Sequence, residues 1–123
     1  MMGEYRRGWA LRYIREAKAD LEAAKKVPYM SSSLVLESIR KARNAIYYSL
    51  GEPAFIEILL REEAENCSPS NDSVLRFLIE LEAAVHQLAQ LEEVNVEAIM
   101  NQADTLLQVA TDIVETFTEE RLD

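Results

Sequence analysis

The sequence predicts an all-α protein, an antiparallel bundle of four long helices and one short helix. Three observations lead to this prediction. Glycine and proline are scarce, with three of each in 123 residues, and both residues disfavour helix interiors. Apolar residues recur at alternating spacings of three and four, which places them on one face of a helix. Clusters of turn-forming residues separate these periodic stretches.

The first two helices are expected over residues 4–26 and after the serine run at 31–33. Pro28 ends the first helix, because proline lacks a backbone N–H and disfavours helical angles in the residue before it. The serine hydroxyls can cap the second helix, which stops at Gly51. The predicted buried positions are Ala10, Ile14, Ala17, Leu21 and Ala24 in the first helix, and Val35, Ile39, Ala42, Ile46 and Ser49 or Leu50 in the second.

Three more helices follow. Pro53 suits the first turn of a short helix, whose apolar face precedes a polar stretch at 61–65. Residues 66–72 form the strongest loop signal, with Ser70 or Asp72 able to start the fourth helix, and Asn95 can cap the last one. The predicted apolar faces are Phe55, Ile56, Leu59 and Leu60; then Val74, Leu78, Leu81, Val85 and Leu88; then Val96, Ile99, Ala103, Leu106, Ala110, Ile113 and Phe117.

Two of these apolar stripes are close to a strict heptad. Such a stripe is narrow and leaves room for a second apolar face on the same helix. We therefore expect a homodimer. The alternative is a monomeric bundle whose extra apolar residues cover its own short helix.

Length and composition limit the kind of protein that this chain can be. The length fits one domain, residues 1–123. Cys67, the single cysteine, cannot form a disulfide within the chain or supply a zinc site, which favours a reducing compartment and a cytoplasmic location. No stretch reaches the roughly 20 apolar residues of a membrane-spanning helix, so no membrane association is expected. We find no complete catalytic motif, and expect no cofactor and no metal.

Charge is distributed unevenly along the chain. Residues 1–51 carry ten Lys or Arg and five Asp or Glu, a balance of +5, whereas residues 52–123 carry three and seventeen, a balance of −14. The basic residues could form a surface for phosphate or an acidic partner, or they could pair with nearby carboxylates. Four pairs have the i,i+4 spacing of helical ion pairs: Arg12–Glu16, Lys18–Glu22, Glu22–Lys26 and Glu37–Lys41. The candidate basic surface consists of Arg6, Arg7, Arg15, Lys18, Arg40, Lys41 and Arg43.

Arg43 differs from the other basic residues. Its helical neighbours are Ile39, Ile46 and Tyr47, so it borders the apolar stripe without a carboxylate on its own helix. A partner must come from elsewhere. The alternatives are a carboxylate of the acidic half or of a second subunit, and a bound anion.

Two stretches of the first fifty residues share a pattern with a known family. One is alanine-rich, at 17–24, and contains Asp20-Leu21; the other has Lys41-Ala42, Ala45 and Leu50-Gly51 in the second helix. In these residues the chain resembles the HEPN superfamily of small helical bundles. The resemblance implies a HEPN-like fold and a binding or accessory role. The partners that it implies are a small nucleotidyltransferase protein, as in toxin–antitoxin-like pairs, a nucleotide or RNA.

Many HEPN ribonucleases use an Arg-x4-His motif. Arg43 and Asn44 match the start of that motif, but Tyr48 stands where it has histidine. A histidine with a pKa of roughly 6.5 can accept a proton at neutral pH, whereas a tyrosine with a pKa of roughly 10 stays protonated. We therefore expect a non-catalytic module. The candidate anion- or nucleotide-binding residues are Arg40, Arg43, Asn44, Tyr47 and Tyr48.

Two other functions stay open. One is a metal-independent ribonuclease in which Arg43, Asn44 and Tyr48 act, with the guanidinium stabilising charge on the phosphorane. The other is a purely structural interaction protein whose basic half docks on the acidic half of a neighbour.

Four further features are weaker. His86 follows Glu82 by four residues, which is an incomplete metal pair. The acidic run at 62–65 is best explained as a solvated helix end. Cys67 is expected to be an incidental thiol. The aromatic residues at positions 5, 9 and 13 could stack a nucleobase, but we expect a core or dimer surface.

Overall fold

The computed structural model describes residues 3–27, 31–51, 53–65, 73–90 and 96–119. These residues form five helices: α1 (Glu4–Lys26), α2 (Ser31–Leu50), α3 (Pro53–Glu65), α4 (Ser73–Gln90) and α5 (Val96–Thr118). No strand occurs in these five segments. The predicted all-α class is therefore confirmed. Among the described helices, none combines the length and the apolar character needed to cross a membrane.

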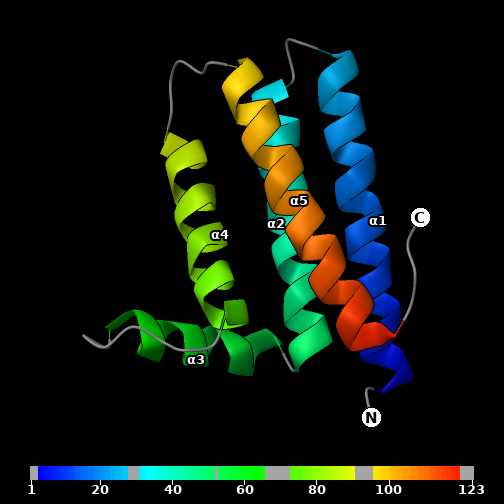
Figure 1. Ribbon diagram of the computed structural model, residues 1–123, viewed down its shortest axis with the longest axis vertical. Coiled ribbons are helices and arrows are strands. Elements are labelled where there is room, and N and C mark those ends of the chain that lie inside the picture. Colours follow the sequence, from blue (N-terminus) through cyan, green and yellow to red (C-terminus); the bar gives the residue numbers. More distant parts are fainter. Residues whose placement is uncertain (1–2, 28–30, 52, 66–72, 91–95, 120–123) are drawn as a thin grey trace.

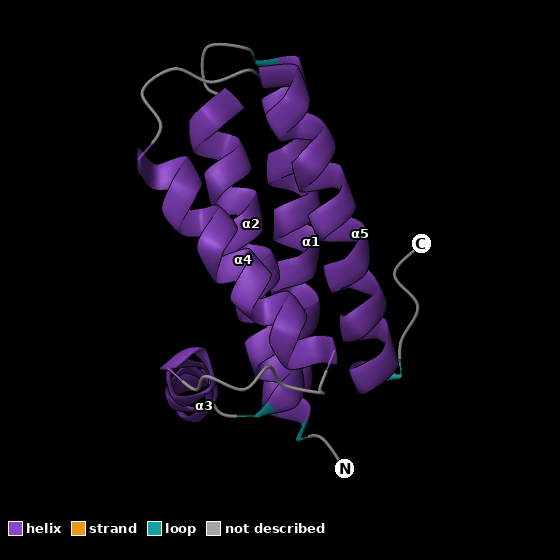
Figure 2. Ribbon diagram, turned by 60° about the vertical axis from the view of Figure 1, so that its left-hand side comes forward, coloured by secondary structure: helices purple, strands orange, loops and turns teal. Residues whose placement is uncertain are grey.

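Helix α2 is the central element of the structure, because it contacts each of the other four helices. Chain direction alternates among the long helices, so that α1 and α4 run opposite to α2 and α5 (Figure 1). Helix α5 packs on both α1 and α2, whereas α4 packs on α2 and α3. Helix α3 lies across one end of the molecule, and Figure 2 shows it end-on beside the four longer helices.

Helices α1 and α2 pack closely because small residues face one another between them. Alanines recur every seven residues on α1, and serine or alanine recurs every seven residues on α2, in opposite chain directions. The six positions, all buried, are Ala10, Ala17 and Ala24 on α1, and Ser31, Ser38 and Ala45 on α2. Small side chains let the two backbones approach until Ser38 Oγ donates a hydrogen bond to the Ala17 carbonyl across the interface, at 2.7 Å.

The serine run at 31–33 does not cap α2 as predicted. All three serines lie inside the helix, so their side chains cannot act at its N-cap. Ser31 Oγ instead donates to the carbonyl of Ala24, at 2.8 Å. That carbonyl belongs to the last turn of α1, where the carbonyl groups have no partner within the helix. The Ser31 hydroxyl therefore supplies a hydrogen-bond donor to the C-terminal end of α1 and links α1 to α2.

Each buried serine or threonine hydroxyl of the described residues has a backbone acceptor. Besides the two serines above, three hydroxyls donate to the carbonyl four residues earlier in their own helix, at 2.6 to 2.8 Å: Ser49, Thr111 and Thr118. Buried polar groups cost free energy unless they are hydrogen-bonded. These five polar residues are therefore buried without the free-energy cost of an unpaired hydroxyl.

The predicted apolar face of α5 is partly wrong. Ile99, Ala103 and Ala110 are buried as expected, but the buried face continues through Leu107 and Val114. Two other members of the predicted stripe, Leu106 and Ile113, are only half-buried, and Phe117 is 42% exposed. Helix α5 packs against two helices at once, so its buried arc is wider than a heptad seam. A straight helix also drifts by about 20° per heptad.

The other predicted faces and ends agree better with the structure. All five predicted core residues of α1 are buried, as are Leu78, Leu81 and Val85 of α4. Helix α1 ends at Lys26 and α2 at Leu50, where the N–H of Gly51 donates to the Tyr47 carbonyl at 3.0 Å. The predicted caps Ser70, Asp72 and Asn95 lie outside the described residues, as do the side chains of Phe55, Leu59 and Leu60.

Candidate binding site

The five predicted site residues do not form one site, because α2 directs them to different neighbours. Arg43 and Tyr47 are one turn apart and contact α4. Tyr48 contacts α1 instead. Arg40 pairs with Glu37 on its own helix, at 3.5 Å, and Asn44 is half-buried.

Glu82 of α4 joins Arg43 and Tyr47 into a three-residue cluster. The Tyr47 hydroxyl donates to Glu82 Oε1 at 2.5 Å. The Arg43 Nη1 atom lies 3.4 Å from the same oxygen and 3.5 Å from Oε2. The guanidinium carbon is also 5.9 Å from the centre of the Tyr47 ring, within the range of a cation–π contact.

This cluster keeps the Tyr47 phenol protonated. Burial raises the pKa of Tyr47 well above its usual value, and the hydrogen bond to Glu82 raises the pKa further, while the charge of Arg43 opposes both effects. A phenol with a raised pKa is a poorer proton acceptor at neutral pH than an ordinary tyrosine. Tyr47 therefore serves as a hydrogen-bond donor in this structure.

The partner of Arg43 is a carboxylate of the acidic half, Glu82, which is one of the alternatives that the sequence left open. Only 21% of the Arg43 side chain is exposed, and its buried Nε atom has no hydrogen-bond partner among the described residues. A phosphate approaching Arg43 would have to compete with the Glu82 carboxylate for the guanidinium. The contact therefore favours a role for Arg43 in holding α2 against α4.

Tyr48 belongs to an aromatic cluster on the other side of α2. Its ring stacks on those of Trp9 and Tyr13, with centroid distances of 6.2 and 5.8 Å. Trp9 also contacts the edge of Tyr5, at 6.4 Å. Arg43 and Tyr48, the two ends of the Arg-x4-Tyr sequence, therefore contact different helices.

Several basic residues of α1 and α2 form ion pairs. Of the predicted pairs, Arg12–Glu16 is present at 3.2 Å. Lys41 pairs across the helix interface with Asp20, at 2.8 Å, and not with Glu37 as predicted. Glu22 was predicted to pair with Lys26, but its partner is Lys25, at 3.6 Å. Lys25 also reaches Asp104 on α5, at 2.9 Å.

Sequence reasoning considered Glu82 only as half of an incomplete metal pair with His86. Its position next to Leu78, Leu81 and Val85 on the helix did carry a signal, because a carboxylate beside a buried stripe needs a partner. The contact between α2 and α4 could not be read from the sequence. His86 is exposed one turn beyond Glu82 on the same helix.

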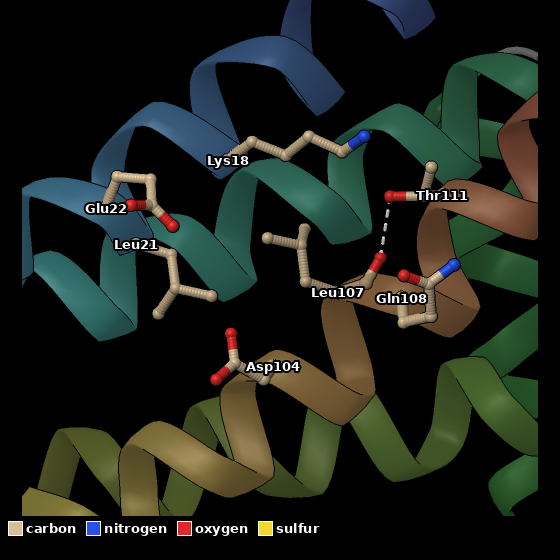
Figure 3. Close-up of a pocket in the computed structure, with 7 residues that line it drawn as sticks. All are labelled: Lys18, Leu21, Glu22, Asp104, Leu107, Gln108 and Thr111. Atoms are coloured by element: carbon tan, nitrogen blue, oxygen red, sulfur yellow. Dashed lines mark hydrogen bonds between the residues drawn. The ribbon is translucent and has the colours of Figure 1, made fainter. Parts of the chain in front are cut away.

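A separate pocket of about 280 Å³ lies between α1 and α5. Figure 3 shows side chains of the two helices facing each other across it. Its residues are Lys18, Leu21, Glu22, Asp104, Leu107, Gln108 and Thr111. The Thr111 hydroxyl already donates to the Leu107 carbonyl, and Asp104 is paired with Lys25. The pocket is thus built from residues more than eighty positions apart, which no local motif could reveal.

Cys67 and the side chains of Glu63 and Glu65 lie outside the described residues. Comparison of the chain with protein-family models, with curated proteins and with solved structures yields no match.

Proposed function

We propose that this chain is a non-catalytic binding module with a HEPN-like four-helix bundle, and that it acts through a protein partner. The HEPN relationship rests on the sequence resemblance over the first fifty residues. The resemblance and the ion pairing of the α2 charges support a protein as the partner.

The contacts that Arg43 and Tyr48 already make within the chain are the observation that supports the non-catalytic role. A general acid or base must reach the same reacting atoms as the group that stabilises charge. Arg43 pairs with Glu82 on α4, whereas Tyr48 stacks on Trp9 and Tyr13 of α1. The two side chains of the degenerate motif are thus held on different sides of α2.

Ion pairing on α2 favours a protein partner over RNA. All three cations of this helix have a carboxylate within 3.5 Å: Arg40 with Glu37, Lys41 with Asp20, and Arg43 with Glu82. Nucleic-acid binding relies on cations that can neutralise phosphates, and the chain as a whole has a formal charge of −9. A small nucleotidyltransferase is the protein partner that the resemblance suggests.

An RNA cleavage assay tests this proposal. Labelled single-stranded and hairpin RNAs are incubated with the wild-type chain and with the variants Arg43→Ala and His86→Ala. The matched control is Arg15→Ala, which removes an exposed arginine of α1. We expect no cleavage by the wild type above the level of the variants.

Cleavage that persists in Arg15→Ala but disappears in Arg43→Ala or His86→Ala would establish a ribonuclease and overturn the proposal. Circular dichroism of each variant shows whether it is folded under the assay conditions. Cleavage that is equal in all four proteins indicates contamination and leaves the expected result intact.

A further inference from the structure

The two ends of the pocket between α1 and α5 differ, and the pairing of the two helices explains why. The helices run in opposite directions (Figure 1), and the ion pair between Lys25 and Asp104 places these two residues at the same level. Each step along α1 toward its N-terminus therefore corresponds to a step along α5 toward its C-terminus. Lys18 and Thr111, both seven residues from that ion pair, lie at the opposite end of the pocket.

Opposite charges are found at these two ends. Figure 3 shows the carboxylates of Glu22 and Asp104 toward one end and the Lys18 amine toward the other, with the Leu107 side chain between them. The carboxamide of Gln108 also lies toward the Lys18 end. The pocket is therefore negative at one end and positive at the other.

The negative end has one carboxylate more than it has cations. Lys25 lies 3.6 Å from Glu22 and 2.9 Å from Asp104, so one ammonium group faces two carboxylates. Both carboxylate side chains are exposed, by 65% and 47%, so a second cation can reach them. No group of three or more metal-ligating side chains occurs in the described part of the chain. An organic ammonium group therefore fits this end better than a metal ion.

The positive end can hold a carboxylate. An ammonium group has three N–H donors, so Lys18 can bind an anion in addition to the interaction that it makes within the chain. The amide nitrogen of Gln108 already donates to Asp112, at 3.1 Å, and the Thr111 hydroxyl donates to a backbone carbonyl. Lys18 is therefore the group that would recognise an anion here.

The wall between the two ends is apolar. Leu21 and Leu107 are buried and form the inner side of the pocket. A methylene chain is stabilised by contact with such a surface, whereas a polar group placed there loses hydrogen bonds to water. The pocket volume of about 280 Å³ is slightly below the range of about 300–1,000 Å³ that is typical of ligand pockets. The pocket therefore suits a small molecule with an apolar middle.

The separation of the two ends sets the length of the ligand. Lys18 and Glu22 are four residues apart, as are Asp104 and Gln108, which corresponds to about 6 Å along a helix. An α-amino acid is too short to reach both ends, because its two charged groups share one carbon atom. An unbranched ω-amino acid carries them at opposite ends of a methylene chain and has about the required length.

We propose that the pocket between α1 and α5 binds a small ω-amino acid. The ammonium group of the ligand lies between Glu22 and Asp104, and its carboxylate contacts Lys18. The methylene chain covers Leu21 and Leu107. A nucleotide is a poor ligand for this pocket, because its phosphate would be repelled by the two carboxylates. The pocket contains no residue of α2, so this inference does not depend on the proposed protein partner or on the non-catalytic role.

A ligand titration of the full chain, followed by ¹H–¹⁵N NMR, tests the proposal. The probe is 6-aminohexanoate, added from about 0.1 to about 30 mM. We expect the backbone amide signals of Leu21, Leu107 and Gln108 to shift with a Kd of about 1 mM, since a ligand of this size can make few contacts. Amide signals that stay unshifted up to about 30 mM would overturn the proposal.

Three related compounds are the matched control ligands. The isomer 2-aminohexanoate carries both charges at one end of the chain, hexanoate lacks the amine, and hexylamine lacks the carboxylate. Each should bind at least about fivefold more weakly than 6-aminohexanoate, because it leaves one end of the pocket without a partner. A control ligand that binds as tightly as the probe would show that the two ends do not act together, and would overturn the proposal.

Two variants test the assignment of the ends. Lys18→Met keeps the apolar stem but removes the charge, and Asp104→Asn removes one carboxylate. Each should raise the Kd of the probe at least about fivefold. The matched control is Lys26→Met, which removes the charge of an exposed lysine of α1 outside the pocket and should leave the Kd unchanged. An unchanged Kd in Lys18→Met, or an equal rise in Lys26→Met, would contradict the assignment, and the same spectra show whether each variant is folded.

Discussion

Glu82 holds two side chains of α2 at once. One of its oxygens accepts the Tyr47 hydroxyl, and both lie near the Arg43 guanidinium. Hydrogen bonds to charged groups contribute about 1.5–3 kcal/mol each, more than bonds between neutral groups. A single carboxylate on α4 therefore determines how this part of α2 is held, and it leaves Tyr47 protonated.

Tyr47 should stay protonated in the folded chain at a pH where an ordinary phenol, with a pKa near 10, ionises. The pKa is raised by burial and by the hydrogen bond to Glu82. We expect Tyr47→Phe to leave the phenolate absorbance of the folded protein near pH 10 unchanged. In denaturant, the same substitution should remove the absorbance of one phenol. Loss of phenolate absorbance in the folded protein would contradict this assignment.

Stability at alkaline pH follows from the same group. A raised pKa in the folded state means that the folded chain keeps its proton to higher pH than the unfolded chain, so the stabilisation is complete below about pH 10 and is lost as pH rises further. The pKa values of Lys25 and Lys41 are also raised, chiefly by hydrogen bonds to Asp104 and Asp20. Loss of the proton from each of these three groups therefore lowers the free energy of unfolding at high pH.

The pairing of α1 with α2 depends on the size of the residues between the helices. Ser38 is buried and donates to the Ala17 carbonyl across the interface. A larger side chain at this position would push the two backbones apart and break this hydrogen bond. The close approach thus explains why the interface contains alanine and serine at seven-residue intervals.

Ser38→Leu should lower the free energy of unfolding by about 1–3 kcal/mol, because overpacking a close interface costs that much. Ser38→Ala should cost about 0.5–1.5 kcal/mol, the net value of one hydrogen bond. The control is Ser32→Leu on the exposed side of α2, which should change stability by less than about 0.5 kcal/mol. Urea unfolding measures all three. Equal effects of leucine at positions 38 and 32 would rule out the close-packing explanation.

The sequence predicted helices better than it predicted the contacts between them. Local signals placed the ends of α1 at Lys26 and of α2 before Gly51, because proline and glycine act on the residues next to them. The same reasoning misplaced the buried face of α5, where Leu107 and Val114 are buried in addition to part of the heptad stripe. A helix that packs against two others has a buried arc set by those neighbours, which its own periodicity does not contain.

For the candidate-site residues too, the sequence predicted local features better than contacts between helices. The lack of a carboxylate near Arg43 on its own helix predicted a partner from elsewhere, and Glu82 is that partner. Which carboxylate it would be could not be predicted, since Arg43 and Glu82 are 39 positions apart. The partners of Tyr48 and Arg43, which belong to α1 and α4, also depend on helix contacts that lie far apart in the sequence.

At the scale of the whole molecule, contacts between the halves join opposite charges. The N-terminal 51 residues are basic and the remainder is acidic, and ion pairs such as Lys25–Asp104 and Arg43–Glu82 cross between these parts. The first is solvent-exposed, and such pairs contribute about 0–1 kcal/mol. The second includes a largely buried arginine, so it should matter more for the association of α2 with α4.

A double-mutant cycle on Arg43 and Glu82 tests most directly whether Arg43 belongs to the fold. Arg43→Met keeps the apolar stem of the side chain, and Glu82→Gln keeps a hydrogen-bond acceptor for Tyr47. We expect each single variant to lower the free energy of unfolding by about 1–3 kcal/mol, and the double variant to lose less than the sum by about 1 kcal/mol or more. Additive effects, or an Arg43→Met variant as stable as the wild type, would contradict the account and return Arg43 to the role of a ligand-binding residue.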